Sequence, residues 1–176
     1  DIYDIAAEGE LTTEKISVNK NEFLTGKSFL VKSELSYNDL ERNLLIKPST
    51  LKVRNSSFKV EGNYRWKEKN IIDITAEGND TDIQTLLSLL TESVAKKFDK
   101  YKSKGDVYFR ANLKGQISRK SSPWIAVNFG FKDATLLNPD TKSQVTGASM
   151  KGSFTSPQIL NIERATLDLN NINGKL

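Results

Sequence analysis

Apolar and polar residues alternate one by one along most of this chain, which is the pattern of β-strands with one buried face. In residues 56–66, one face carries mostly aromatic and β-branched residues and the other carries charged and amide residues. The same alternation predicts strands over 10–18, 28–37, 44–46 with 51–53, 56–66, 70–77, 106–117, 124–131, 148–154, 159–162 and 165–169. Strands of about ten residues span about 33 Å, whereas five or six residues is usual. The chain is therefore expected to be mainly β, with a long-stranded antiparallel sheet.

A short motif recurs within these strands: a polar residue, Gly, any residue, then a large or β-suited one. Its glycines are Gly9, Gly62, Gly115, Gly152 and Gly174. Glycine weakens a strand but permits bends, bulges and a close approach of another backbone. We expect these positions to help curve the sheet into an open groove or half-barrel whose apolar interior would suit acyl chains.

Residues 82–101 replace the alternation with a helical period. Apolar residues recur there at spacings of three and four, and they define a packing face made of Ile83, Leu86, Leu87, Leu90, Val94 and Phe98. Thr81 is expected to cap this helix, with Gln84 as its capping-box partner. We expect the apolar stripe to pack on the sheet; a membrane-binding or partner-binding face is the alternative.

Lysines crowd the predicted end of this helix and the residues after it. They are Lys96, Lys97, Lys100, Lys102 and Lys104. Cations suit the carbonyl end of a helix, and this explanation is favoured over attraction of lipid phosphates.

Composition argues against catalysis. The chain has no Cys and no His, which excludes thiol nucleophiles, imidazole bases and disulfides. Asp80 and Asp82 bracket the helix start and are explained as complements of the helix dipole. No cofactor-binding or metal-binding motif is present, so we expect no catalytic residue, no metal and no cofactor.

Charge gives only a weak indication of a partner. The 26 basic and 22 acidic residues are interspersed and leave a net charge of +4, which is typical of a solvated surface rather than a nucleic-acid site. The 176 residues suit one domain. Because the chain starts at Asp1 and stops inside a predicted strand, we expect a single β-rich segment, 1–176, of a longer repetitive protein.

One stretch resembles a known family. Residues Gly78 to Leu90, followed by a lysine-rich helix end and Tyr101 to Phe109, resemble the AsmA-like family of bacterial envelope proteins. The order of Lys114-Gly115, Ile125 to Phe131 and Lys151 to Phe154 is similar as well. The resemblance covers most of residues 51–176, and it implies a periplasmic β-groove protein, anchored to the inner membrane outside this segment, that carries phospholipid toward the outer membrane.

These observations predict a non-enzymatic segment supporting phospholipid transport and outer-membrane assembly. Its expected partners are phospholipid acyl chains and other segments of the same chain. The candidate lipid-facing or core residues are Phe58, Val60, Tyr64, Val107, Phe109, Leu113, Ile125, Val127, Phe129 and Phe131. The alternative is a structural or adhesive β-module that binds proteins through its sheet edges, and a carboxylate-based glycosidase is a distant third.

Overall fold

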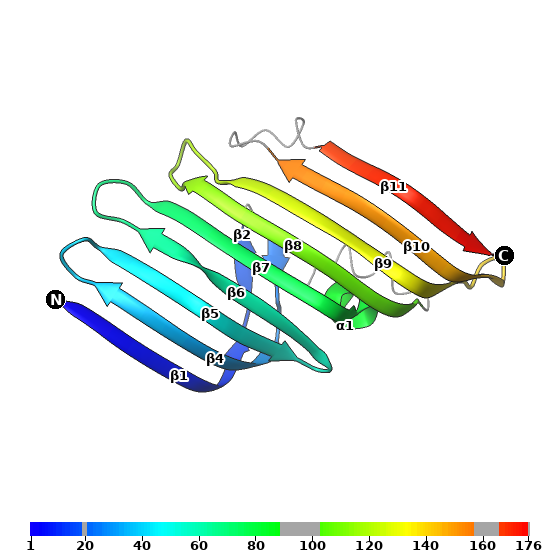
Figure 1. The fold of residues 1–176 in the computed structure, drawn as a ribbon, viewed down its shortest axis with the longest axis horizontal. Coiled ribbons are helices and arrows are strands. Elements are labelled where there is room, and N and C mark those ends of the chain that lie inside the picture. Colours follow the sequence, from blue (N-terminus) through cyan, green and yellow to red (C-terminus); the bar gives the residue numbers. More distant parts are fainter. Residues whose placement is uncertain (19–20, 89–102, 157–165, 176) are drawn as a thin grey trace.

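Nine strands form one open antiparallel sheet in the computed structural model, which describes residues 1–18, 21–88, 103–156 and 166–175 (Figure 1). In spatial order the strands are β1 (Ile2–Thr13), β4 (Lys27–Asn38), β5 (Asn43–Val53), β6 (Ser56–Arg65), β7 (Ile71–Asp82), β8 (Lys104–Gln116), β9 (Trp124–Asn138), β10 (Ser143–Ser156) and β11 (Thr166–Lys175). Every neighbouring pair is antiparallel. Because β1 and β11 lie at opposite edges, the sheet does not close into a barrel.

Two small elements lie on the same side of this sheet. The hairpin of β2 (Ile16–Val18) and β3 (Asn21–Phe23) connects β1 to β4, and α1 (Ile83–Ser88) follows β7. Both are behind the sheet in Figure 1. The opposite side, toward the viewer, carries no element formed by the described residues.

The pairing registers separate the residues cleanly into two faces, because directly paired residues point to the same side. One row of paired residues crosses all nine strands as Gly9, Val31, Leu51, Phe58, Gly78, Phe109, Phe129, Gly152 and Leu169. The adjacent row, on the other side, is Glu8, Lys32, Thr50, Lys59, Glu77, Arg110, Asn128, Ser153 and Asp168. We call the first side the apolar face and the second the polar face.

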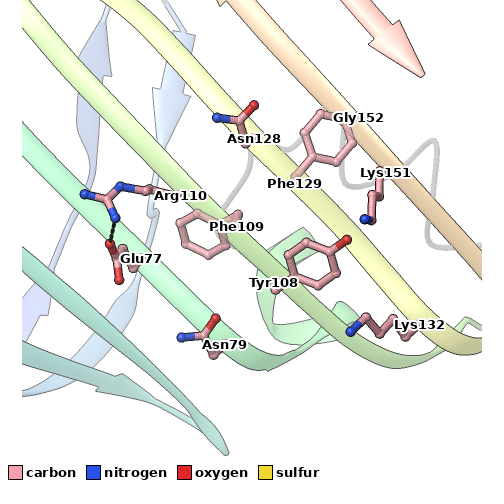
Figure 2. A pocket seen from close by; sticks show the side chains of 10 residues that line it. All are labelled: Glu77, Asn79, Tyr108, Phe109, Arg110, Asn128, Phe129, Lys132, Lys151 and Gly152. Atoms are coloured by element: carbon pink, nitrogen blue, oxygen red, sulfur yellow. Dashed lines mark ion pairs between the residues drawn. The ribbon is translucent and has the colours of Figure 1, made fainter. Parts of the chain in front are cut away.

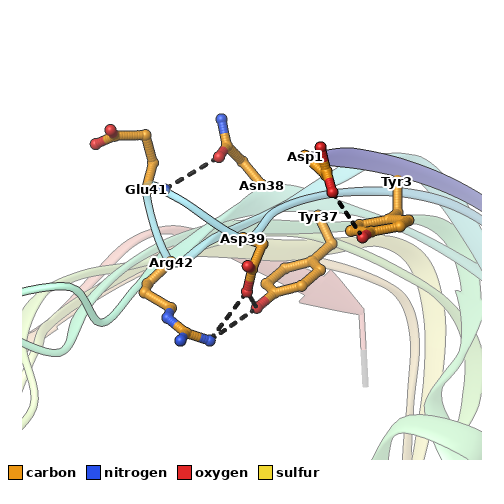
Figure 3. A network of polar contacts seen from close by, with 7 residues as sticks. All are labelled: Asp1, Tyr3, Tyr37, Asn38, Asp39, Glu41 and Arg42. Carbon is orange, nitrogen blue, oxygen red and sulfur yellow. Dashed lines mark hydrogen bonds and ion pairs between the residues drawn. The ribbon is translucent and has the colours of Figure 1, made fainter.

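Bulges bend the strands. The register shifts between six of the eight strand pairs, and a bulge bends its strand and increases the local twist. Left-handed residues stand at four of these places: Asp80, Asp133, Gly147 and Asn171, with φ near +50° to +58°. Figure 3 looks along the sheet and shows the strands bending into an arch, with the Tyr37 ring on its inner side.

Two apolar clusters fix the small elements to the apolar face. Ile83 of α1 packs with Val107, Ala134 and Ala148, and the last two are at most 3% exposed. Leu24, just after β3, packs against the second cluster, which is Phe29, Val53 and Phe58. Both clusters lie toward the end of the sheet at which β7 runs into α1, so this end has the buried core.

The predicted fold class is confirmed: the protein is mainly β, with one long open sheet and a short helix packed on it. The helix begins at Ile83 and is described as far as Ser88; residues 89–101 of the predicted helix lie outside the described residues. The predicted strand over 159–162 also lies outside them.

Several strand limits differ from the prediction for a physical reason. β5 runs through Pro48, where the sequence predicted a break. At this proline the register shifts in the pairing with β4 and in the pairing with β6, and a bulge tolerates the missing N–H. β9 continues past Phe131 because the bulge at Asp133 reverses the alternation, so that Ala134 and Leu136 return to the apolar face. The predicted strand 10–18 is instead the end of β1 and the separate strand β2.

The cap of the helix also differs from the prediction. The Asp82 carboxylate accepts hydrogen bonds from the Thr85 backbone N–H at 2.8 Å and from the Thr85 hydroxyl at 3.0 Å. Asp82 is therefore the N-cap, in the geometry that an N-cap requires. The prediction of Thr81 as the cap is wrong because its side chain is fully buried on the apolar face, paired with Val107. The Gln84 amide donates to the Ser103 carbonyl instead of completing a capping box.

Candidate functional site: the apolar face of the sheet

The apolar face is the most extended feature of the molecule. At its middle, apolar residues of β8 and β9 pair directly: Phe109 with Phe129, Ala111 with Val127 and Leu113 with Ile125. The face continues across β10 and β11 through Phe154 and Leu169. The inner side of an arched open sheet thus carries a mainly apolar surface that spans nine strands, in which Ser33 and Ser49 are hydrogen-bonded to each other at 2.8 Å.

Glycines shape this surface by leaving room for rings. Gly78 lies between Phe58 and Phe109, whose ring centroids are 5.9 Å apart. A Cβ on Gly78 would come within 2.5 Å of Phe109 Cε1, and one on Gly152 would come within 2.6 Å of Phe129 Cζ. Each phenyl ring therefore covers the bare backbone of the neighbouring strand, a device that protects strand glycines.

All five motif glycines lie on the apolar face, and a Cβ on Gly174 would meet Val145 and Ala148 there. Gly9 pairs with Val31, Gly62 with Ile74, Gly115 with Ile72 and Gly152 with Phe129. At Gly62 a Cβ would come within 2.3 Å of the Asp73 carbonyl oxygen and 2.7 Å of Ile74 Cα. These are backbone atoms, so Gly62 permits a close approach of β6 and β7 that no side chain would allow.

The ten candidate lipid-facing or core residues all lie on the apolar face. Phe58 and Val107 are buried under the small elements, at 6% and 7% exposure. The others are half-buried: Val60, Tyr64, Phe109, Leu113, Ile125, Val127, Phe129 and Phe131. The structure brings all ten together on one surface, mainly over β6, β8 and β9.

The predicted packing face of the helix is partly described. Ile83 is buried, and Leu86 is half-buried against the same cluster, as expected. Leu87 has no described side chain, and Leu90, Val94 and Phe98 lie outside the described residues.

One part of the surface was not predicted from the sequence. Residues 2–9 of β1 were not predicted as a strand, yet Tyr3 and Ile5 extend the apolar face to the sheet edge, each about half exposed. The alternation of these residues with Asp4 and Glu8 was the signal that could have found the strand.

The polar face is built for water. Cross-strand ion pairs lie along it, including Arg110 with Glu77 at 2.7 Å and Lys114 with Asp73 at 2.6 Å. Arg110, Lys114 and Asp73 are more than half exposed and Glu77 is partly exposed, so each pair contributes little to stability. The face keeps one side of the sheet solvated while the other is apolar, which is common for antiparallel sheets.

One ion pair on this face lowers the pKa of a carboxyl group. The hydrogen bond from Lys47 Nζ to Asp4 Oδ1, at 3.1 Å, lowers the pKa of the Asp4 carboxyl below its ordinary value, and Ser36 adds to the effect. A carboxyl with a lowered folded-state pKa stabilises the fold above its unfolded-state pKa. That contribution is lost as the pH falls through the folded-state pKa.

A shallow depression of about 590 Å³ lies on the polar face around Tyr108 (Figure 2). The Lys132 ammonium lies 5.9 Å from the centroid of the Tyr108 ring, and the Glu77 carboxylate forms an ion pair with Arg110. The depression therefore offers cationic and amide groups but no pair of free convergent carboxylates of the kind a glycosidase uses.

Within the described ranges, no group of three or more acidic side chains is placed to hold a metal ion. No helix in the same part of the chain is long and apolar enough to cross a bilayer.

Comparisons of this chain with models of known protein families, with curated proteins and with solved structures found no match.

Proposed function

We propose that this chain is a non-enzymatic β-groove module that binds phospholipid acyl chains on its apolar face. The observation that supports the proposal is that the apolar face extends across all nine strands, while the opposite, polar face carries cross-strand ion pairs. Monomeric proteins rarely expose large contiguous apolar areas without a binding purpose.

Apolar contact fits an acyl chain because it is non-directional and scales with the buried area. Each buried CH₂ contributes about 0.8 kcal/mol, so a chain of many methylenes gains substantial affinity without any specific polar contact. Selectivity among acyl chains is expected to be low for the same reason.

The resemblance to AsmA-like proteins supports a setting for this activity. We place the module in the periplasm, as part of a longer protein anchored to the inner membrane through regions outside this segment. There it would support phospholipid transport and assembly of the outer membrane, together with other segments of the same chain.

The test compares two substitutions at adjacent positions of β9 that point to opposite faces. Val127 is half-buried on the apolar face and Asn128 is exposed on the polar face. Val127→Lys introduces a cation into the groove, whereas Asn128→Lys adds the same charge to the solvated side. Phospholipid extracted from each purified chain is quantified by mass spectrometry, with circular dichroism to verify folding.

The wild type and Asn128→Lys are expected to retain similar amounts of phospholipid. Displacing two methylenes costs about 1.6 kcal/mol, so Val127→Lys should bind roughly tenfold less. If Val127→Lys does not fold, Val127→Thr serves as the milder change with a smaller expected loss. A wild type without lipid, or equal lipid in both lysine variants, contradicts the proposal.

A second function is favoured by one observation. Among the described strands, β1 and β11 each pair on one side only, and all of β1 except Thr13 is exposed. Unpaired edges are templates for added strands, so a structural or adhesive β-module would bind protein partners there. This alternative predicts association that depends on β1 or β11 and persists when the apolar face is changed by Val127→Lys.

A further inference from the structure

A row of aromatic side chains marks one end of the apolar face. It consists of Tyr3, Tyr37, Tyr64 and Trp66, and we call it the aromatic row. The registers place all four on the apolar face, because Tyr3 pairs with Tyr37, Leu44 pairs with both Tyr37 and Tyr64, and Trp66 follows Tyr64 by two residues. The row lies at the opposite end of β4 and β6 from the buried Phe29 and Phe58.

The four rings stack on one another. The centroid distances are 6.2 Å from Tyr3 to Tyr37, 5.9 Å from Tyr37 to Trp66 and 5.1 Å from Trp66 to Tyr64, with interplanar angles of 19°, 5° and 26°. Stacked pairs of this kind add stability beyond their buried area. The row is therefore a defined rim of the groove rather than a set of independent side chains.

The polar ends of two rings point out of the groove. The Tyr37 hydroxyl donates to Asp39 Oδ1 at 2.8 Å and accepts from Arg42 Nη1 at 3.2 Å, and Arg42 also pairs with Asp39 at 3.1 Å (Figure 3). The Tyr3 hydroxyl donates to Asp1 Oδ2 at 3.3 Å. The ring bodies thus face the apolar surface while their tips meet charged groups in water.

Tyrosine and tryptophan with this orientation are the residues that occupy the boundary between hydrocarbon and lipid headgroups. The groups beyond the rings carry both signs of charge, a guanidinium at Arg42 and carboxylates at Asp1 and Asp39. This combination complements a zwitterionic headgroup, with its phosphate near the arginine and its ammonium near the carboxylates and ring faces.

The distance along the sheet suits a lipid that starts at this rim. Tyr64 lies six positions after Phe58, which is about 20 Å of strand. The hydrocarbon of one leaflet is about 15 Å deep, half of the bilayer core. An acyl chain directed from the aromatic row along β6 would therefore end near the cluster of Phe29, Val53 and Phe58.

From these observations we infer that the groove binds lipid in one orientation. A bound zwitterionic phospholipid places its headgroup at the aromatic row and its acyl chains toward α1 and the Phe58 cluster. This inference rests on the proposed function, because it requires that phospholipid occupy the apolar face.

The two tryptophans of the chain allow a direct test. Trp66 belongs to the row, whereas Trp124 pairs with Lys114 on the polar face. In Trp124→Phe the only emitting tryptophan is Trp66, and in Trp66→Phe it is Trp124. Each variant is incubated with vesicles of phosphatidylcholine that carry a nitroxide either on the choline or at carbon 12 of an acyl chain. The vesicles are removed by flotation, and the lipid that remains with the soluble protein is counted by phosphate assay.

We expect a soluble complex in which the choline label quenches Trp66 at least twofold more than the carbon-12 label, and in which neither label quenches Trp124. Equal or reversed quenching of Trp66, with lipid present, overturns the headgroup position while the groove stands. The headgroup position is also overturned if quenching of Trp66 is lost when the vesicles are removed although the phosphate assay still finds lipid in the complex. A complex without lipid overturns both this inference and the proposed function.

Discussion

Single residues decide how closely the strands of this sheet approach each other. The recurrent glycines were expected to bend the strands, and the structure assigns them a second use at the apolar face. Gly152 lies beneath the phenyl ring of Phe129, and Gly62 lies against the backbone of β7. Gly9 instead meets nothing within 4 Å. The glycines of the same motif therefore contribute differently to the free energy of unfolding in different strands.

This difference predicts the outcome of two alanine substitutions. Gly62→Ala forces a Cβ against backbone atoms that cannot rotate away, at a φ of +157°, so it should lower the free energy of unfolding by about 1–3 kcal/mol. Gly9→Ala should be neutral or raise it by up to about 1 kcal/mol, because alanine costs less chain entropy in a strand. Urea unfolding followed by circular dichroism measures both. Equal effects at the two sites would show that the steric reading is wrong.

At the scale of elements, the junction of β7 with α1 turns a strand into a helix within a few residues. The left-handed Asp80 shifts the register, Thr81 is buried in the sheet, and Asp82 caps the helix. The first turn then places Ile83 against Val107 and Ala134. Three consecutive residues thus end one periodicity and begin the other.

The cap gives a prediction at this scale. Asp82→Ala removes the acceptor for the Thr85 N–H and hydroxyl, so we expect a loss of about 1 kcal/mol in the free energy of unfolding. Asp82→Asn keeps a side-chain oxygen that can cap, so it should lose clearly less. The two variants are compared with the wild type by urea denaturation. No loss in Asp82→Ala would mean that packing of Ile83 alone fixes the start of the helix.

At the scale of the whole molecule, the sheet has a centre and two edges. In the part of the chain that the structure describes, β6, β7 and β8 are paired on both sides, whereas β1 and β11 have one neighbour each. Local opening is easiest where backbone hydrogen bonds are few and exposed. Stability should therefore decline from the middle of the sheet to its edges.

Amide hydrogen exchange tests this gradient and also separates the two functions. We expect the slowest exchange in β6–β8 and the fastest in β1 and β11, at every protein concentration. If the chain instead associates through its edges, the amides of β1 or β11 gain protection as the concentration rises. Concentration-dependent protection would favour the adhesive module over the lipid groove.

Much of this architecture follows from the sequence because period-two alternation depends on each strand alone. Residues 56–66 and 106–117 carry it without interruption, and β6 and β8 appear where it predicts them. All ten residues chosen for the groove lie on one face for the same reason, since a strand fixes the side of every residue once one is fixed.

Only the tertiary structure decided where the alternation changes phase and which strands meet. The bulges at Pro48, Asp80 and Asp133 reverse the face of the residues that follow, and no local pattern states that a strand continues beyond them. The aromatic row likewise joins residues from 3 to 66 that become neighbours through pairing over long sequence distances. Local periodicity fixes the two faces of a strand, whereas the curvature and the polarity of the groove arise from contacts between strands.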